Sequence, residues 1–186
     1  MKKVLRPAFF ERSTLTVAKD LLGKYLVRRV GGREVALIIT ETEAYFGFDD
    51  KGSHAHRGRT ERNTPMFGKA GAIYVYFTYG MHWMLNLVCG KPGFPAAVLI
   101  RGAGEVVGPA RLTKFLKIDK RLNALPLGKK SGLWVEDRGV KLSPKHIKKT
   151  PRIGIPNRGV WTCKPWRFAM IVNKKGRVQK LDPKKG

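Results

Sequence analysis

Two glutamates and a tyrosine occupy alternate positions in the stretch Ile39 to Tyr45, which reads ITETEAY. The stretch is rich in β-branched and apolar residues and is predicted to form a strand. Because side chains alternate between the faces of a strand, Glu41, Glu43 and Tyr45 are expected to share one face. A carboxylate there can take a proton from water or stabilise developing positive charge, but it can equally be a surface acid paired with a lysine.

The charge of the chain indicates its partners. The 186 residues include 38 Lys and Arg against 13 Asp and Glu, a formal net charge of +25. A field of this sign concentrates polyanions, so DNA or RNA is the leading partner class and an acidic membrane surface the second. A lysine-rich thermophile surface is a third interpretation, but that pattern normally enriches Glu alongside Lys, and Glu is scarce here.

Aromatic residues cluster near the same acids. Tyr45, Tyr74, Tyr76 and Tyr79 are four of the five tyrosines, and a ring that stacks on a nucleic-acid base contributes about 1–3 kcal/mol. Tyr74 and Tyr76 could instead be strand tyrosines packed on the core. Tyr79 lies in a predicted turn just before Gly80, where an exposed ring could act as a wedge in a base stack. Acids and aromatic rings beside a long polar loop predict a pocket.

Other chemistries have weaker support. The run His54-Ala55-His56 could begin a metal site, but no third ligand stands at a characteristic spacing, so we expect neither a metal nor a cofactor. P-loop, GxGxxG and GxSxG motifs do not occur. Cys89 and Cys163 lack CxxC spacing, and neither a signal peptide nor an apolar run of membrane-span length is evident. We therefore expect an intracellular monomer without a membrane partner, in the cytoplasm and nucleoid of a prokaryote or the nucleus of a eukaryote.

The predicted elements form one β-rich domain over residues 1–186. A helix capped by Ser13 should end at Gly23, and a second helix should start at Pro109. A polar loop over residues 46–70 and a basic tail over residues 173–186 complete the chain, and we expect the tail to be solvated. The predicted strands cover residues 25–30 and 34–45, joined through a Gly-Gly turn, and 72–78, 82–88, 96–101, 132–136 and 166–172.

Several motifs, in order along residues 8–172, resemble the alkyladenine (3-methyladenine) DNA glycosylases of the mammalian type. They are ETEAY from Glu41, the histidine at 54, IYVYFTYGM from Ile73, VLIR from Val98, GPARL from Gly108, RIGI from Arg152 and KPWRF from Lys164. The resemblance implies an α+β single domain with a curved antiparallel sheet, flanking helices and a protruding β-hairpin that enters the DNA minor groove. It also implies hydrolysis of the N-glycosidic bond of 3-methyladenine, 7-methylguanine, hypoxanthine or ethenoadenine in double-stranded DNA.

The resemblance assigns residue roles by position in these motifs. Glu43 would be the general base for water, with Arg101 beside it, and the role of Glu41 stays open between raising the pKa of Glu43 and pairing with a loop arginine. The product would be an abasic site, made by a monofunctional enzyme without lyase activity. The residues expected to bind the extruded base are Tyr45, His54, Tyr76 and Asn86. The residues expected to contact DNA are Tyr79, Met81, Met66, Arg59 and Arg62.

Two alternatives use the same residues differently. A non-catalytic nucleic-acid binding module would use the aromatic rings for stacking and the basic surface as a track, but it would leave the acids without a purpose. A metal-dependent nuclease would use Glu41, Glu43, Asp49 and His54, and chelators would abolish its activity.

Overall fold

The long strand β3, Arg33–Phe46, organises the sheet. In the computed structural model, which describes residues 2–171, the first part of β3 pairs with β2, Tyr25–Val30. Its second part pairs with β10, Arg167–Met170, on one side and with β6, Ala96–Ala103, on the other. All of these pairings are antiparallel. β3 therefore joins two groups of strands, and ITETEAY lies where β6 and β10 flank it.

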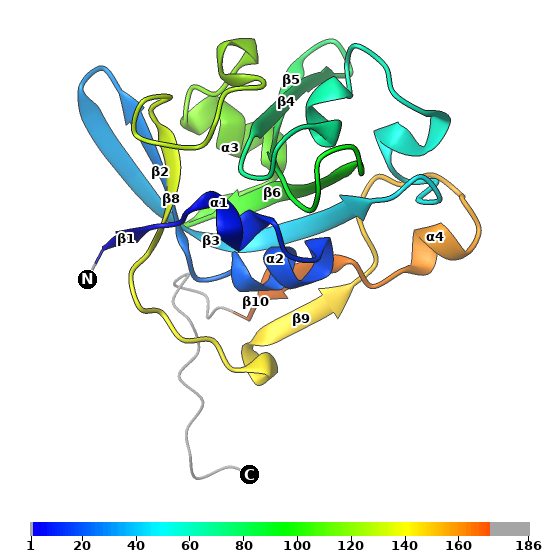
Figure 1. The fold of residues 1–186 in the computed structure, drawn as a ribbon. Helices are drawn as coiled ribbons and strands as arrows, with labels where there is room; N and C mark the ends of the chain where they lie inside the picture. The colour runs from blue at the N-terminus through cyan, green and yellow to red at the C-terminus, as the bar shows by residue number, and fades with distance from the viewer. Residues whose placement is uncertain (1, 172–186) are drawn as a thin grey trace, which may run out of the picture.

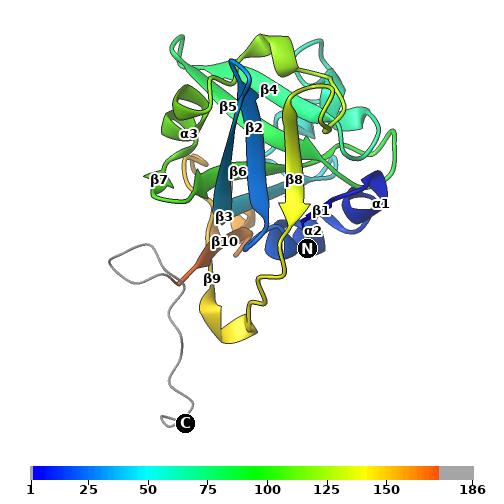
Figure 2. The ribbon, with the colours of Figure 1, turned by 90° about the vertical axis from the view of Figure 1, so that its left-hand side faces the viewer.

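The main path of the sheet runs in the order β1, β8, β2, β3, β6, β5, β4, with β10 and then β9 added beside β3, and β7 beside β6. The remaining strands are β1 Lys3–Val4, β4 Ile73–Thr78, β5 His82–Val88, β7 Val106–Val107, β8 Leu133–Asp137 and β9 Ile147–Thr150. Figure 2 shows that β8 and β2 run in a different direction from β4 and β5, so the sheet is strongly twisted along its length.

Short helices cover the sheet and shape its loops. The α-helices are α1 Pro7–Phe10, α2 Thr14–Asp20, α3 Pro109–Phe115 and α4 Val160–Cys163. The 3₁₀ helices are η1 His54–Arg57, η2 Thr64–Phe67, η3 Lys120–Leu122 and η4 Pro144–His146. Figure 1 shows α2 beside β3 and α3 beside β5 and β6. Both η1 and η2 lie in the long polar segment between β3 and β4.

Glycine allows two tight hairpin turns. Gly31 and Gly32, which join β2 to β3, both have positive φ angles, as predicted for a two-residue turn. The β4–β5 hairpin turns through Tyr79, with φ 52°, and Gly80, with φ 65°. A left-handed backbone is uncommon for a residue as bulky as tyrosine, and such conformations occur often at functional sites. This turn places the Tyr79 ring at the exposed hairpin tip.

The core lies between the sheet and α2, α3 and the N-terminal segment. The ITETEAY strand contributes to it with alternate residues: Ala44 is fully buried in the core, and the hydroxyl of Thr42 donates to the carbonyl oxygen of Ala18 in α2 at 2.8 Å. The same strand thus packs against the core with one face while its other face carries Glu41, Glu43 and Tyr45. Because the core-facing residues are completely buried, the backbone that carries the acids is held firmly in place.

The α+β class and the antiparallel sheet predicted from the sequence are confirmed. Boundaries shift by a few residues: the strand expected over 166–172 is 167–170, and the helix expected to end at Gly23 ends at Asp20, with Leu21 as its C-cap. The short strands β1, β7 and β9 were not predicted, because strands of two to four residues give little alternation. The predicted basic tail lies outside the described residues.

Candidate active site

Glu43 is fully buried yet has partners for both carboxylate oxygens. Its Oε2 accepts a 2.8 Å hydrogen bond from the Tyr45 hydroxyl, and its Oε1 accepts a 2.7 Å bond from the backbone N–H of Ile153. Nε of Arg101, on β6, lies 3.4 Å from Oε1. Burial raises the pKa of Glu43 above its ordinary value, while Arg101, the Ile153 N–H and the Tyr45 hydroxyl oppose this rise. The site therefore holds a carboxylate that is more basic than a solvent-exposed one.

Glu41 shares the face of Glu43, as predicted, and pairs with two arginines from neighbouring strands. Its Oε1 lies 2.8 Å from Nε of Arg101 and 2.5 Å from Nε of Arg167 on β10. Arg167 also donates to the hydroxyl of Thr150 on β9 at 2.9 Å. The open question about Glu41 is thereby answered: its partners are strand arginines rather than loop arginines, and its charge adds a small upward contribution to the pKa of Glu43.

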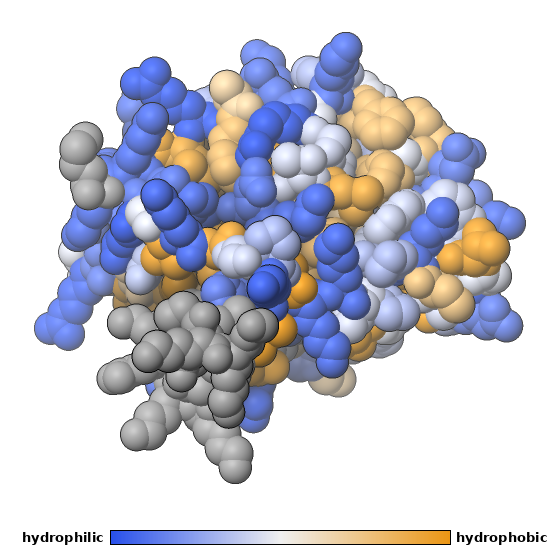
Figure 3. Space-filling view, turned by 90° about the horizontal axis from the view of Figure 1, so that it is seen from below, coloured by the Kyte–Doolittle hydropathy of each residue, from blue (hydrophilic) through white to orange (hydrophobic). Residues whose placement is uncertain are grey.

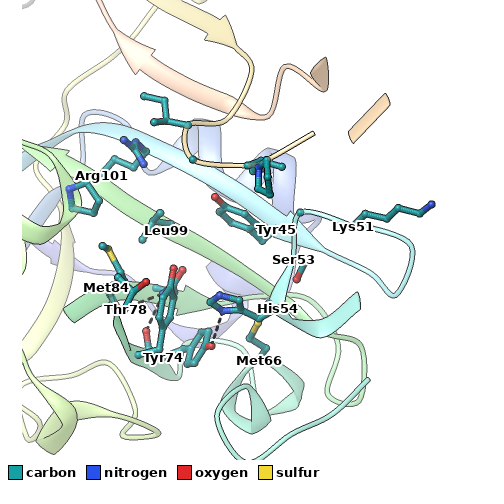
Figure 4. A pocket seen from close by; sticks show the side chains of 18 of the residues that line it. Tyr45, Lys51, Ser53, His54, Met66, Tyr74, Thr78, Met84, Leu99 and Arg101 are labelled. Atoms are coloured by element: carbon teal, nitrogen blue, oxygen red, sulfur yellow. Dashed lines mark hydrogen bonds between the residues drawn. The ribbon is translucent and has the colours of Figure 1, made fainter. Parts of the chain in front are cut away.

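A cavity of about 380 Å³ is lined by the three partners of Glu43, which are Tyr45, Arg101 and Ile153 (Figure 4). That volume lies in the usual range for small-molecule sites. The rings of His54 and Tyr76 meet edge to face, with centroids 4.5 Å apart. Leu99 of β6 and Met84 of β5 add apolar surface. The aromatic and polar residues that line the cavity include Tyr45, His54, Tyr74, Tyr76, Tyr79, Asn86 and Arg101.

His54 is a neutral group in this pocket. Its Nδ1 lies 3.2 Å from the hydroxyl of Tyr74. Tyr74 itself is only 1% exposed. Burial, assisted by the positive charge of Arg62, lowers the pKa of His54 to about 4. The ring is therefore neutral at pH 7. Tyr74 therefore acts both as a core tyrosine and as a partner that orients a pocket residue.

The residues expected to contact DNA fall into separate places. Tyr79 and Met81 are 79% and 66% exposed at the tip of the β4–β5 hairpin. Arg62 donates to the carbonyl oxygen of Phe77 at 2.9 Å, and its guanidinium lies over the Tyr76 ring. Met66 is only 2% exposed and belongs to the wall of the pocket rather than to the outer surface.

Asn86 and Arg59 are placed differently from each other. The amide of Asn86 lies in the pocket wall and donates to the carbonyl oxygen of Tyr74 at 3.2 Å, so it is held across the β4–β5 pair. Arg59 does not join the pocket, because its guanidinium lies over the Phe67 ring on the other side of η2. Arg59 and Arg62 are three positions apart in the segment between β3 and β4, yet Arg59 lies over Phe67 and Arg62 lies over the pocket residue Tyr76.

Sequence reasoning missed several residues that organise the site. Asn63 accepts from the Thr60 N–H and donates to the carbonyl oxygens of His54 and Gly58, so it holds η1 in place. Arg152 is buried behind Tyr45 and pairs with Asp50. No local pattern marks Arg152 and Asp50 as partners, because they are 102 positions apart in the chain. Their only sequence signal was the RIGI motif, which contains Arg152.

The described residues show neither a metal centre nor a membrane-spanning helix. Among residues 2–171, no three His, Cys, Asp or Glu side chains are grouped so that they could hold a metal ion. His54 contacts Tyr74, and Nδ1 of His56 lies 3.0 Å from the carbonyl oxygen of Phe48. Within the same residues, no helix has the length and apolar character needed to cross a membrane.

Comparison with known proteins defines the class to which this fold and pocket belong. A sequence model of the methylpurine-DNA glycosylase family matches residues 8–107 and 104–174. The chain belongs to this family and is a DNA glycosylase, a class of DNA repair enzyme. The resemblance drawn from the motifs is thereby confirmed, and DNA is confirmed as the substrate polymer.

Individual relatives are similar over nearly their whole length. The chain is 44% identical to a protein of Methanocella arvoryzae, covering 89% of this chain and 91% of that one. It is 42% identical to a protein of Ehrlichia chaffeensis, covering 90% and 93%. A Streptomyces avermitilis protein is 41% identical, with 86% and 84% covered. All three are named, provisionally, as 3-methyladenine DNA glycosylases.

Proposed function

We propose that this enzyme removes alkylated or deaminated purines from double-stranded DNA by hydrolysing their N-glycosidic bond. Its substrates would be 3-methyladenine, 7-methylguanine, hypoxanthine and ethenoadenine. The observation that carries the proposal is the fully buried Glu43 carboxylate, which is bonded to three residues that line an aromatic pocket: Tyr45, Ile153 and Arg101. A module that only bound nucleic acid would have no use for an acid there, since a buried charge often stabilises a protein no better than an apolar residue even when it is paired, as Glu43 is with Arg101.

The pocket and the hairpin tip together suit an extruded nucleotide. A base inside a duplex is out of reach, and turning it outward costs a few kcal/mol. The exposed ring of Tyr79 would fill the gap left in the stack, with Met81 beside it. The extruded purine would enter between Tyr45 on one side and His54 with Tyr76 on the other. Stacking on these rings would offset the cost of extrusion.

Glu43 would supply the chemistry of bond cleavage. Cleavage of a glycosidic bond passes through an oxocarbenium-like state, which an adjacent carboxylate stabilises. A carboxylate has about four lone-pair sites, so Glu43 can accept from Tyr45, Ile153 and Arg101 and keep one site for a water molecule. As the water oxygen bonds to C1′ of the sugar, a proton of the water would pass to Glu43 and the C1′–N bond would break. The base would leave with the bonding electron pair, and a purine alkylated at N3 or N7, which is a cation in the DNA, would leave as a neutral molecule. Arg101 would keep the carboxylate ionised and correctly oriented.

The pocket suits purines that leave easily. A base alkylated at N3 or N7 is a cation, and the faces of Tyr45 and Tyr76 attract cations. A neutral His54 adds no competing positive charge. We also propose that Met66, which lies in the pocket wall, borders the base rather than the duplex.

The function is tested with duplexes that each carry one damaged purine. Incubation followed by alkali should break the strand at the lesion, and the free base should be recovered. Excision of at least one alkylated or deaminated purine is expected. Failure on all four lesions, with DNA binding retained, would favour the binding-module alternative, and cleavage of undamaged DNA that a chelator stops would favour the nuclease.

A monofunctional enzyme should form no covalent bond with the sugar. Lys51 is the one lysine lining the cavity among the described residues, and Figure 4 shows its side chain pointing away from Tyr45 and His54. Sodium borohydride added during turnover should therefore trap no protein–DNA adduct. Lys51→Ala should excise bases at a rate close to that of the wild type. A trapped adduct that disappears in Lys51→Ala would show lyase chemistry instead.

Replacing Tyr79 tests the role of the hairpin tip. Tyr79→Ala should weaken formation of the extruded state by about 1–3 kcal/mol, the typical contribution of one stacked ring. Excision from a fully paired duplex should fall accordingly, by about 10-fold to 100-fold. Excision from a lesion placed opposite an abasic gap should fall less, because less unstacking is needed there. Equal losses on both duplexes would contradict a wedge role.

A further inference from the structure

The guanidinium of Arg152 and the carboxylate of Asp50 form a bidentate ion pair inside the protein. Nη1 of Arg152 lies 2.6 Å from Oδ2 of Asp50, and Nη2 lies 2.7 Å from Oδ1. Both side chains are completely buried. Removing two charges from water is costly, and a buried pair often stabilises a protein no better than apolar residues of similar size. The pair therefore calls for an explanation other than stability.

Arg152 packs against the ring of Tyr45, a residue that lines the aromatic pocket. Its guanidinium carbon lies 4.5 Å from the centroid of the Tyr45 ring and 5.0 Å from that of Trp166. Nη1 also donates to the carbonyl oxygen of Ala44, at 3.0 Å, which fixes the β3 backbone next to Tyr45. The Tyr45 ring, which lines the cavity and hydrogen-bonds Glu43, is thus supported from behind.

The same pair fixes both chain segments that border the pocket. The residue after Arg152 is Ile153, whose N–H donates to Glu43. On the other side, Oδ1 of Asp50 accepts from the N–H of Gly52, shaping the turn that leads to His54. A Cβ atom at Gly52 would lie 2.7 Å from Nη2 of Arg152, so only glycine leaves room for the guanidinium. These contacts reach three separate parts of the site.

We infer that Arg152 and Asp50 are positioning residues for base excision, an inference that rests on the proposed function. The pair is not expected to touch substrate. It aligns the Tyr45 ring, the Ile153 N–H that holds Glu43, and the turn before His54, so that all three meet around one extruded base. A misplacement of about 1 Å in such a constellation can cost roughly 100-fold in rate.

Arg152→Lys and Asp50→Asn test this role. Lysine keeps the positive charge, but its ammonium group cannot form a bidentate pair with Asp50 or stack on Tyr45 as the planar guanidinium does. Each variant should bind hypoxanthine-containing duplex within a few-fold of the wild type, while its single-turnover excision rate should fall by about 10-fold to 100-fold. The acidic limb of its pH–rate profile should move to higher pH, because a displaced Ile153 N–H no longer lowers the pKa of Glu43.

Arg138→Lys provides the matched control. Arg138 pairs with Glu136 at 2.8 Å and lies over the Tyr25 ring at 4.3 Å, so it combines an ion pair with a tyrosine contact away from the pocket. This control should lower the melting temperature somewhat, with no change in excision rate or pH profile.

The experiments distinguish a failure of the positioning role of Arg152 and Asp50 from a failure of the proposed base excision. A wild-type rate and an unshifted profile in Arg152→Lys would overturn the positioning role, as would a rate loss that only matches the loss of folded protein. If Arg152→Lys does not fold, Asp50→Asn decides by the same criteria, because it changes the charge while keeping the shape. A wild-type enzyme that releases no damaged base would instead overturn the proposed function.

Discussion

Glu43→Gln should reduce the single-turnover rate of base excision by about 100-fold to 10,000-fold, the usual contribution of a general base. The amide cannot take a proton from water or counter positive charge on the sugar. Binding of lesion-containing duplex should change little, because glutamine has nearly the same shape and can still accept from the Ile153 N–H. Comparing a gel-shift titration with the rate of release of hypoxanthine or ethenoadenine checks both expectations.

The excision rate of the wild-type enzyme should depend on pH through the ionisation of Glu43. Glu43 must be ionised to act, and its pKa lies above the ordinary 4.5. The excision rate should therefore rise with pH through an apparent pKa above that value and then reach a plateau. His54 contributes no step between pH 5 and pH 8 because its pKa is about 4. The acidic limb should be absent from the residual activity of Glu43→Gln.

Glu136→Gln is the matched control for this substitution. Glu136 is also nearly buried, and it accepts hydrogen bonds from Trp134 and Arg138 at 2.8 and 2.9 Å, but it lies on β8. Its replacement should affect stability and leave excision unchanged. Full activity in Glu43→Gln would move the general base elsewhere, and Glu41→Gln would then be the next variant to assay.

Arg101→Met should cause the second largest loss, about 100-fold to 1,000-fold in excision rate, which is typical when one preorganised electrostatic contact is removed. Arg101 makes the largest contribution that opposes the burial-induced rise in the pKa of Glu43. Its removal should raise that pKa further, so less of the carboxylate is ionised at pH 7. A pH–rate profile with its acidic limb displaced to higher pH would check this mechanism directly.

A second substitution separates catalysis from stability. Arg101→Met should also destabilise the fold, because among residues 2–171 it leaves the buried Glu41 with Arg167 as its one ion-pair partner and the buried Glu43 with none. Adding Glu41→Gln removes one of those charges, so the double variant should regain melting temperature without regaining rate. Recovery of both would mean that Arg101 serves only to balance charge.

The strand of the acids was predictable because its information is local. The alternation in ITETEAY placed Glu41, Glu43 and Tyr45 on one face, and the structure confirms that placement. The Gly-Gly turn before it and the exposed turn at Tyr79 were also evident from neighbouring residues. These features depend on propensities that act over a few positions.

The supports of the site could not be predicted because they depend on distant pairings. Glu41 meets Arg167 across 126 positions, and Ile153 reaches Glu43 across 110. In a chain with so many Lys and Arg, any acid has dozens of candidate partners, and only the three-dimensional fold selects among them. The polar segment after β3 lacks a hydrophobic period, so η1 and η2 were read as loop.

Ile153 and Arg167, which hold Glu43 and Glu41, are synthesised more than 100 residues after these acids. Glu43 and Tyr45 emerge early from the ribosome, but the N–H that holds the carboxylate belongs to Ile153 and the second cation on Glu41 belongs to Arg167. A nascent or proteolysed chain that stops before residue 150 carries the acid without the groups that tune it. Such fragments should be unable to release bases, because they lack the Ile153 N–H that holds Glu43 and the Arg167 guanidinium that pairs with Glu41.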